Sequence, residues 1–208
     1  MFIGIAGIIG AGKTTLTRKL ADHLGYEAFH EPVEENLYLS DFYEDMKRWG
    51  AMMQLYLLFK RFEQHQQIVW GAGKGAVQDR TIYEDTIFAR MLHEAGFIDE
   101  RDYGTYVGHF NVMKRFLLYP DVLVYLRVDP EVSMKRIAER GRAAEREITP
   151  DYMQKLHAGY EDFVSEMGRY TRVLTLEWNE YREPEEVARL VREEMSDNLK
   201  FLRDLKRI

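Results

Sequence analysis

A glycine-rich segment between an apolar run and an amphipathic run restricts the fold of this chain more than any other feature. The pattern G-x-x-x-x-G-K-[ST] is matched by residues 7–14, Gly7-Ile8-Ile9-Gly10-Ala11-Gly12-Lys13-Thr14. Residues 2–6 before it are short and apolar, as a buried strand is. Residues 14–24 after it place leucines at helical spacing. Because both flanks fit, the segment predicts a phosphate-binding loop between a strand and a helix.

The chemistry of such a loop follows from its backbone and its last polar residues. Glycines allow backbone N–H groups to close around an anion at a helix N-terminus. Lys13 is then expected to reach the β- and γ-phosphates of ATP, and Thr14 to place its hydroxyl on Mg²⁺. The alternative is a glycine-rich turn that binds no ligand. The predicted ATP-binding residues of the loop are Gly7, Ile8, Ile9, Gly10, Ala11, Gly12, Lys13, Thr14 and Thr15.

Length and charge exclude several classes of protein. A chain of 208 residues with a net charge of -6 predicts one compact α/β domain over residues 1–208. The acidic balance argues against a nucleic-acid or anionic-membrane surface. The chain has no cysteine, which excludes disulfides and thiolate metal sites. We find no signal peptide and no apolar run long enough to span a bilayer, so we expect a cytoplasmic protein.

Strand-like and helix-like segments alternate along the whole chain, which favours a mostly parallel sheet covered by helices. The predicted strands lie near residues 2–6, 26–30, 75–79, 121–127 and 172–177. Ligands of such sheets bind beyond the carboxyl ends of the strands. Functional residues are therefore expected after the second, third and fourth strands.

An acidic residue follows the second predicted strand, directly before a proline. Proline cannot continue a sheet ladder, so the strand is expected to stop at Glu31 and to hold its carboxylate at the edge of the sheet. The alternative is an acidic loop that merely precedes a helix. Glu34 and Glu35 fit that alternative, whereas Glu31 is the residue that the strand end would fix.

Residues 49–70 predict a long helix that is apolar nearly all round and therefore buried, with Met53 among its apolar residues. Gln54 and Arg61 interrupt it seven residues apart, on one face. A buried Gln or Arg costs several kcal/mol unless something hydrogen-bonds to it. The alternative for Arg61, a helix end that emerges into solvent, leaves Gln54 unexplained.

The third predicted strand ends in Asp79-Arg80-Thr81. An acid after an apolar strand beside a phosphate loop suits a role linked to Mg²⁺. Asp85 lies on the helix that follows. The carboxyl end of this strand therefore adds charged side chains to the edge where Glu31 is expected.

Arginines gather where the helix after the fourth strand ends. Arg136 and Arg140 share one face, Gly141 breaks the helix, and Arg142 lies on the loop beyond. Such a run of charge is usually a solvated surface. In this position it is also suited to an arginine lid, at about residues 140–149, that neutralises a transferring phosphate.

With these residues in place the chain resembles the deoxynucleoside kinases, in particular the bacterial deoxyadenosine, deoxyguanosine and deoxycytidine kinases. The resemblance covers residues 2 to about 163 and rests on five segments in order: residues 7–14, Glu31-Pro32-Val33, Tyr43 with Trp49 and Gln54, Asp79-Arg80-Thr81, and Arg140-Gly141-Arg142-x-x-Glu145. It implies a three-layer P-loop kinase fold, with a five-stranded parallel sheet flanked by helices and an arginine lid. It also implies a homodimer.

The resemblance assigns roles to the reacting groups. Glu31 would accept the proton of the sugar 5′-hydroxyl, with Arg80 beside it near the reacting phosphate. Asp79 would help Thr14 to hold Mg²⁺ through water. The catalytic residues implied are Glu31, Arg80, Lys13, Arg140 and Arg142, and Arg136 and Arg140 of the lid region join the ATP-binding set.

For the nucleoside, the resemblance implies that Tyr43 and Glu145 bind the 3′-hydroxyl. Gln54 would read the base edge, with Arg61 and Asp85 as a second polar pair in the base pocket. The full substrate-binding set is Glu31, Tyr43, Met53, Gln54, Arg61, Arg80, Asp85 and Glu145. The predicted reaction is ATP-dependent phosphorylation of a deoxynucleoside, with deoxyadenosine favoured and deoxyguanosine or deoxycytidine as weaker substrates.

Two alternatives share the phosphate loop. A thymidylate-type monophosphate kinase also has Glu-Pro and Asp-Arg motifs, but it usually has an acid where Ile9 stands and an Arg where His30 stands. A substrate with a 5′-phosphate would need that additional cation. A nucleotide-dependent switch or binding module would need a guanine-reading Asn-Lys-x-Asp, which this sequence lacks.

Overall fold

The computed structural model describes residues 1–31, 36–71, 73, 75–142, 145 and 148–205, of which 197–205 are described as helical backbone only. Its strands are β1 (Phe2–Ala6), β2 (Glu27–Phe29), β3 (Ala76–Asp79), β4 (Val122–Arg127) and β5 (Arg172–Glu177). Its helices are α1 (Lys13–Leu24), α2 (Leu39–Glu44), α3 (Met46–Trp70), α4 (Asp85–Glu94), α5 (Glu100–Met113), α6 (Pro130–Arg140), α7 (Pro150–Met167) and α8 (Pro184–Leu205). Two short 3₁₀ turns are η1 (Ile82–Glu84) and η2 (Lys114–Phe116).

The strands form one five-stranded sheet in the order β2-β3-β1-β4-β5, and all neighbouring pairs are parallel. The first five residues of β4, Val122–Leu126, are fully buried because helices cover both faces of the sheet. The predicted five-stranded parallel α/β fold is therefore confirmed. The second strand is shorter than predicted, since β2 ends at Phe29.

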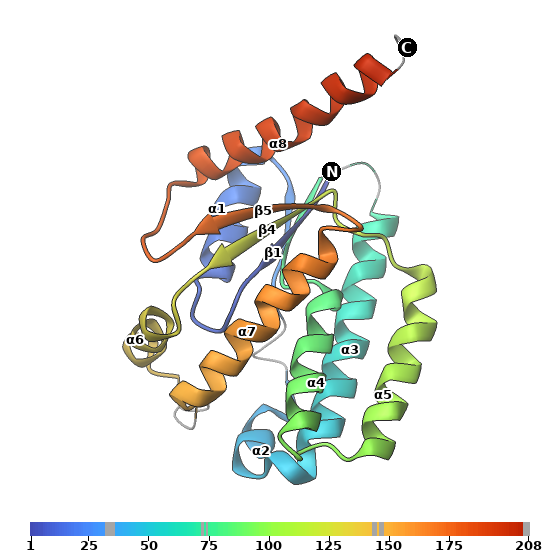
Figure 1. Cartoon of the computed structure of the whole chain (residues 1–208), viewed down its shortest axis with the longest axis vertical. Coiled ribbons are helices and arrows are strands. Elements are labelled where there is room, and N and C mark those ends of the chain that lie inside the picture. Colours follow the sequence, from blue (N-terminus) through green and yellow to red (C-terminus); the bar gives the residue numbers. More distant parts are fainter. Residues whose placement is uncertain (32–35, 72, 74, 143–144, 146–147, 206–208) are drawn as a thin grey trace.

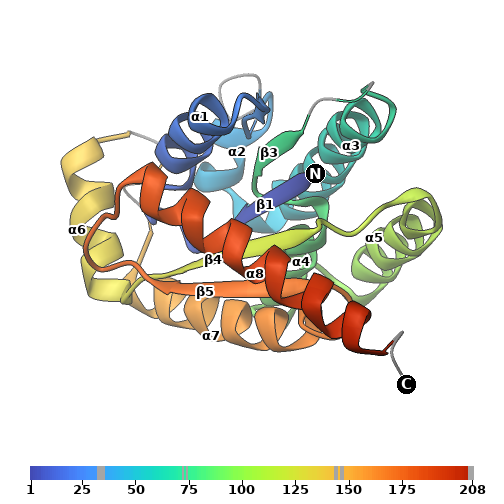
Figure 2. The same ribbon diagram turned by 90° about the horizontal axis from the view of Figure 1, so that it is seen from above.

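Helices lie on both faces of the sheet (Figures 1 and 2). Helix α8 packs along α1 on one face, and α4 packs against α7 on the other, with α3 and α5 beside α4. Tyr125 of β4 shows how this second layer is joined to the sheet: its ring lies parallel to the ring of Tyr160 of α7, with centroids 6.1 Å apart. Among the described helices, none combines the length and apolar character needed to cross a membrane.

Helix α3 corrects one expectation from the sequence. It begins three residues earlier than predicted, at Met46, and it is not buried all round. Met52 and Phe59 are about half exposed and Trp70 is 76 % exposed. These residues face away from the sheet, whereas Gln54 and Arg61 lie on the face that packs inward. The apolar composition of α3 therefore does not identify its buried side, but its polar residues do.

Because the sheet is parallel, the carboxyl ends of its strands meet at one edge. In Figure 1 this edge points toward α2, α6 and the start of α7. Helix α2 is fixed there by a small apolar cluster in which Phe42 packs with Met53 and Leu57 of α3. Chain segments that are distant in sequence thus enclose the space in front of the phosphate loop.

Candidate active site

The phosphate loop connects β1 to α1, as predicted. Gly10 and Gly12 have φ values of 79° and 92°, a conformation that residues with a side chain rarely adopt. A Cβ on Gly10 would also lie 2.8 Å from Ser133 Oγ. The loop is therefore held in a shape that only glycine permits, and α1 begins at Lys13 with its unpaired N–H groups toward the cavity.

Lys13 is buried, and its ammonium donates hydrogen bonds to the carbonyl oxygens of Gly7 (2.9 Å) and Ile8 (3.0 Å). Burial and the neighbouring Arg80 lower its pKa to about 8, although acidic neighbours oppose the shift. An ammonium that folds back on its own loop in this way is available to exchange these carbonyls for phosphate oxygens.

Thr14 and Asp79 meet at the end of β3. The Thr14 hydroxyl donates to Asp79 Oδ2 at 2.5 Å. The other carboxylate oxygen, Oδ1, is buried and has no hydrogen-bond partner among the described residues. A hydroxyl and a carboxylate beside a phosphate loop fit Mg²⁺, which takes few protein ligands and keeps water and phosphate oxygens as the others.

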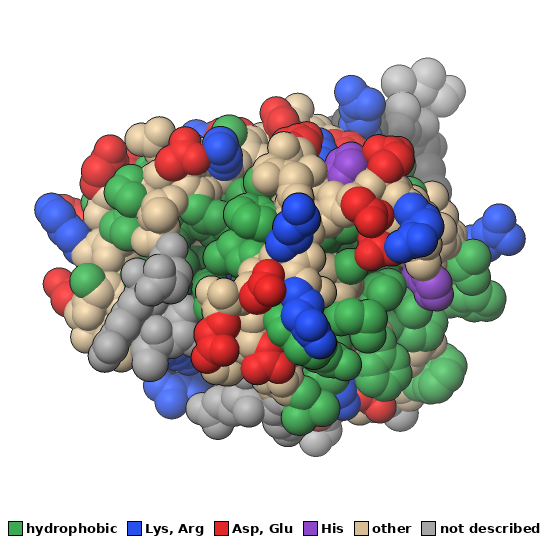
Figure 3. All heavy atoms as spheres, turned by 90° about the horizontal axis from the view of Figure 1, so that it is seen from below, with side chains coloured by type: hydrophobic (Ala, Val, Ile, Leu, Met, Phe, Trp, Pro, Cys, Tyr) green, Lys and Arg blue, Asp and Glu red, His purple; other side chains and the backbone are tan. Residues whose placement is uncertain are grey.

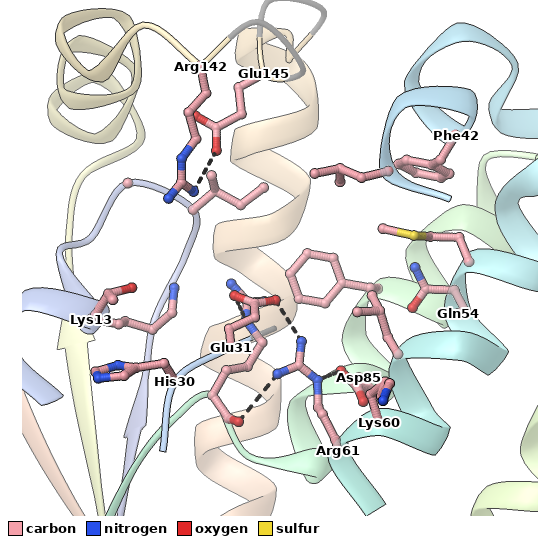
Figure 4. Close-up of a pocket in the computed structure, with 18 of the residues that line it drawn as sticks. Lys13, His30, Glu31, Phe42, Gln54, Lys60, Arg61, Asp85, Arg142 and Glu145 are labelled. Atoms are coloured by element: carbon pink, nitrogen blue, oxygen red, sulfur yellow. Dashed lines mark hydrogen bonds and ion pairs between the residues drawn. The ribbon is translucent and has the colours of Figure 1, made fainter. Parts of the chain in front are cut away.

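Glu31 lies beside Arg61 at the centre of the site (Figure 4), and Arg80 approaches its other carboxylate oxygen; both arginines are buried. Arg61 Nη2 donates to its Oε1 at 2.7 Å, and Arg80 Nε lies 3.5 Å from its Oε2. Burial alone would raise the pKa of Glu31, but Arg80 and Arg61 outweigh it and lower the pKa to about 2. The strand was expected to hold Glu31 directly; β2 instead ends two residues earlier, at Phe29, and the arginines fix the carboxylate.

Arg61 also contacts Asp85, which gives the buried α3 arginine the partner that the sequence required. Its Nε donates to Asp85 Oδ1 at 2.5 Å, and both side chains are about 1 % exposed. Burial raises the pKa of Asp85 and Arg61 opposes that rise. Asp85 Oδ2 and the nearby Gln54 Oε1 are buried without hydrogen-bond partners among the described residues. These two oxygens are open acceptors for a ligand.

On the side of the expected lid, Glu145 forms ion pairs with both arginines of that segment. Arg140 Nη2 lies 2.5 Å and Arg142 Nη1 3.6 Å from Glu145 Oε1. Burial raises the pKa of Tyr43 to about 12, and the nearby Glu145 carboxylate is the second largest cause of that rise. Within the expected lid, residues 143–144 and 146–147 fall outside the described part of the chain, as do Pro32, Val33, Glu34 and Glu35.

Arg136 occupies a different place from the other arginines. Its guanidinium donates to the carbonyl oxygens of Trp178 (3.0 Å) and Asn179 (2.9 Å). It also lies 4.2 Å from the ring centroid of Tyr181, whose ring is next to Gly12. Arg136 is therefore on the outer side of the phosphate loop and does not line the central cavity.

The central cavity has a volume of about 920 Å³ and brings most of the predicted residues together. Those lining it are Ile9, Gly10, Gly12, Lys13, Thr14, Thr15, Glu31, Tyr43, Met53, Gln54, Arg61, Arg80, Asp85, Arg140, Arg142 and Glu145. Gly7, Ile8, Ala11, Asp79 and Arg136 lie outside it.

The cavity also has lining residues that the sequence analysis did not identify as part of the site. Phe88 lies three residues after Asp85 on α4, and the Arg80 guanidinium carbon is 4.5 Å from its ring centroid. Tyr152, in the first turn of α7, lines the side near the lid. The sequence could have indicated Phe88, because it lies three residues after Asp85 on the same face of α4. No local feature of the sequence distinguishes Tyr152 from other core aromatic residues.

The comparisons with known proteins agree with this geometry. The model of the deoxynucleoside kinase family matches residues 3–199. The chain belongs to the deoxynucleoside kinase family. The prediction that it is a phosphotransferase of this family is thereby confirmed, and the thymidylate-type kinase and the nucleotide-dependent switch are set aside.

Individual members of the family are similar over nearly the whole chain. A deoxyadenosine kinase of Dictyostelium discoideum is 43% identical over 98% of this chain and 82% of its own length. A deoxyadenosine/deoxycytidine kinase of Bacillus subtilis is 43% identical over 78% of this chain and 76% of its own. The solved structure of a deoxyadenosine kinase from M. mycoides with bound dCTP has a TM-score of 0.83 at 32% identity, and the match covers 95% of this chain and 100% of that one.

Proposed function

We propose that this chain phosphorylates the 5′-hydroxyl of a 2′-deoxynucleoside with ATP as donor, in nucleotide salvage in the cytoplasm. Deoxyadenosine is the favoured acceptor, and deoxyguanosine or deoxycytidine are weaker ones. The observation that carries the proposal is Glu31, an ionised carboxylate held by Arg61 and Arg80 in the same cavity as Lys13. The similar enzymes named above include kinases of deoxyadenosine and deoxycytidine.

In the reaction, the 5′-hydroxyl oxygen of the nucleoside attacks the γ-phosphorus of ATP. Its proton goes to the carboxylate of Glu31, and ADP leaves with the electrons of the broken P–O bond. Lys13, Arg140 and Arg142 counter the charge that spreads over the phosphoryl oxygens. Arg80, whose Nε lies 3.5 Å from Glu31 Oε2, adds positive charge beside the reacting phosphate.

Thr14 and Asp79 are the residues that would hold Mg²⁺, the hydroxyl directly and the carboxylate through water. The buried Oδ1 of Asp79, which has no hydrogen-bond partner in the described part of the chain, supports this assignment. Held by these two residues, Mg²⁺ would supply positive charge to offset the charge that develops on the phosphate oxygens. Arg136 is assigned to ATP binding from the outer side of the phosphate loop.

The sugar is positioned by Tyr43 and Glu145, which bind the 3′-hydroxyl in this proposal. Both line the cavity on the side of the lid. Tyr43 also limits the space near the 2′ position and thereby disfavours a ribonucleoside. A site built to hydrogen-bond a hydroxyl discriminates strongly, because its buried partners are left unpaired when the hydroxyl is missing.

The base is read by Gln54, with Met53 beside it and the Arg61–Asp85 pair beyond. A Gln amide accepts from the N6 amino group of adenine and donates to N7. The buried Oε1 of Gln54, to which none of the described residues donates a hydrogen bond, supports this role. Since Arg61 and Asp85 fill the space past the base edge, little room remains for the methyl group of thymine.

We further propose a homodimer formed through helices, as in similar enzymes. Light scattering should then give about twice the chain mass of 24.7 kDa. A monomer mass at micromolar concentration would contradict this. We propose no nucleic-acid or membrane partner, because charges of both signs are interspersed on the face drawn in Figure 3 and the net charge is -6.

The proposed function is tested by offering purified protein and MgATP a series of acceptors: deoxyadenosine, thymidine, deoxyadenosine 5′-monophosphate, or none. We expect rapid formation of deoxyadenosine 5′-monophosphate and little product from thymidine. Transfer to the monophosphate instead would reassign the site to a monophosphate kinase. A preference for thymidine would leave the kinase in place and refute the assignment of the base pocket.

A further inference from the structure

A further buried carboxylate lies behind the reacting groups and has no part in the mechanism above. Glu84, in η1, is 0 % exposed. One of its oxygens accepts the backbone N–H of Thr81 at 2.7 Å and lies 3.2 Å from the Thr81 hydroxyl. Its other oxygen accepts from the hydroxyl of Tyr160 at 2.8 Å. Burial raises the pKa of Glu84, while Arg80 and the hydrogen bonds from Thr81 and Tyr160 oppose that rise. A buried carboxyl group is costly unless its oxygens are hydrogen-bonded, so this arrangement needs an explanation.

Tyr160 connects this carboxylate to the arginine that faces Glu31. Its hydroxyl donates to Glu84 and accepts from Arg80 Nη1 at 3.0 Å. Among the described residues, Arg80 forms an ion pair with Glu31 and none with Glu84. The tyrosine hydroxyl therefore lies between Arg80 and the carboxylate of Glu84, and the Nε edge of Arg80 faces Glu31.

The Tyr160 hydroxyl suits a position between Glu84 and Arg80 because it can donate one hydrogen bond and accept another. Burial raises the pKa of Tyr160 well above its ordinary value, so the hydroxyl keeps its proton and directs it to Glu84. Its lone pair is then free for the Arg80 N–H. The ring is fixed as well, since it stacks parallel to Tyr125 and edge-on to Phe88 and Phe163.

The backbone at Arg80 shows why its side chain needs support. Its φ of 63° is the one positive value among the described non-glycine residues. A non-glycine residue in this conformation is strained and persists only when its surroundings enforce it. Phe88 lies against one face of the guanidinium, and Tyr160 fixes its Nη1 end.

We propose that Tyr160, supported by Glu84, is a positioning residue for Arg80: its hydroxyl holds the guanidinium in the orientation that serves Glu31 and the transferring phosphate. Tyr160 lies on α7, which starts directly after the lid segment, so it also joins the lid-bearing helix to the reacting arginine. The inference rests on the proposed function and adds a residue that touches neither substrate.

The test compares Tyr160→Phe with Tyr125→Phe. Tyr125 is a matched control because its ring is equally buried and its hydroxyl donates to Glu161, at 2.9 Å, away from Arg80. We expect Tyr160→Phe to lower kcat for deoxyadenosine about tenfold or more, with both KM values within about twofold of wild type. Tyr125→Phe should keep its kcat. Equal kcat losses in the two variants, or a loss confined to KM, would overturn the proposal.

A double-mutant cycle with Arg80→Lys separates positioning from general destabilisation. Removing the Tyr160 hydroxyl should cost little further kcat once Arg80 is replaced, whereas a full tenfold loss in that background would refute the coupling. If Tyr160→Phe does not fold, Glu84→Gln takes its place in the cycle, because an amide directed at Tyr160 disrupts the same contact. A wild type that transfers no phosphate would refute both proposals; an active wild type with unaffected variants would refute only the role of Tyr160.

Discussion

Arg61 serves two parts of the cavity with one guanidinium. Its Nε pairs with Asp85 on the side of the base pocket, and its Nη2 pairs with Glu31 on the side of the reacting phosphate. In the proposed function, base recognition and the ionisation of Glu31 are therefore linked through one side chain. A substitution of Arg61 is expected to change both the acceptor preference and the turnover.

Replacing Arg61 with Met and Asp85 with Ala together should raise the preference for thymidine. The pair is about 1 % exposed, so its removal frees buried space for the thymine methyl group. We expect the ratio of kcat/KM for thymidine to that for deoxyadenosine to rise at least ~10-fold, since a single group in a pocket is worth about 10–200-fold. Steady-state assays on both nucleosides measure it. An unchanged ratio would show that the Arg61–Asp85 pair does not determine which base the pocket accepts.

His65, in α3, is expected to make stability depend on pH. It is fully buried, and its Nε2 accepts the backbone N–H of Leu118 at 3.0 Å. Burial lowers its pKa from 6.5 to about 4. The unfolded chain therefore takes up a proton near pH 6.5 and the folded chain does not, so the free energy of unfolding should fall as pH drops from 6.5 to 4.

The expected loss from His65 over that interval is about 3 kcal/mol. Urea titrations at several pH values should show a smaller decline for His65→Gln, whose amide oxygen still accepts a hydrogen bond but does not titrate. His109→Gln, at an exposed position, is the control. Parallel declines for wild type and His65→Gln would contradict the assignment.

Arg140 is the last residue of α6 and Arg142 lies on the loop that follows, which suits groups that act only when both substrates are bound. Arg140 and Arg142 are paired with Glu145 rather than directed at the phosphate loop. Closure over ATP would exchange these pairs for phosphate oxygens.

Arg142→Ala should therefore reduce kcat/KM, on the order of 10³-fold, while the affinity for deoxyadenosine changes little. Arg140 still pairs with Glu145 in that variant, so the sugar contact is preserved. Arg189→Ala, at an exposed pair on α8, is a suitable control. Equal losses of nucleoside binding and turnover would point to a structural role for Arg142.

Helix α3 illustrates what local sequence can and cannot predict within one element. Its extent and its inward polar residues were predictable, because an isolated Gln and Arg in an apolar helix need partners. Its exposed face was not, since Met52 and Phe59 look like core residues in the sequence. Which apolar side chains are buried depends on the neighbouring helices, and that information is not local.

The molecule as a whole assembles the cavity from residues that are far apart in the sequence. Alternating strands and helices were enough to predict the parallel sheet, and the phosphate loop was enough to place the nucleotide end of the site. The Arg80–Tyr160–Glu84 contact was beyond reach, because Tyr160 lies 80 residues from Arg80 and resembles any other core aromatic in the sequence. The resemblance supplied the roles of Tyr43 and Glu145, which no spacing rule indicates.

The central claim is that the ionised Glu31 accepts the proton of the 5′-hydroxyl, and Glu31→Gln tests it most directly. General bases contribute about 10²–10⁴-fold, so kcat for deoxyadenosine should fall by that factor while the binding of an ATP analogue stays unchanged. Glu27→Gln, at an exposed position on β2, is the control and should keep its turnover. A folded Glu31→Gln protein that binds the analogue and phosphorylates deoxyadenosine at a near-normal kcat would contradict the mechanism.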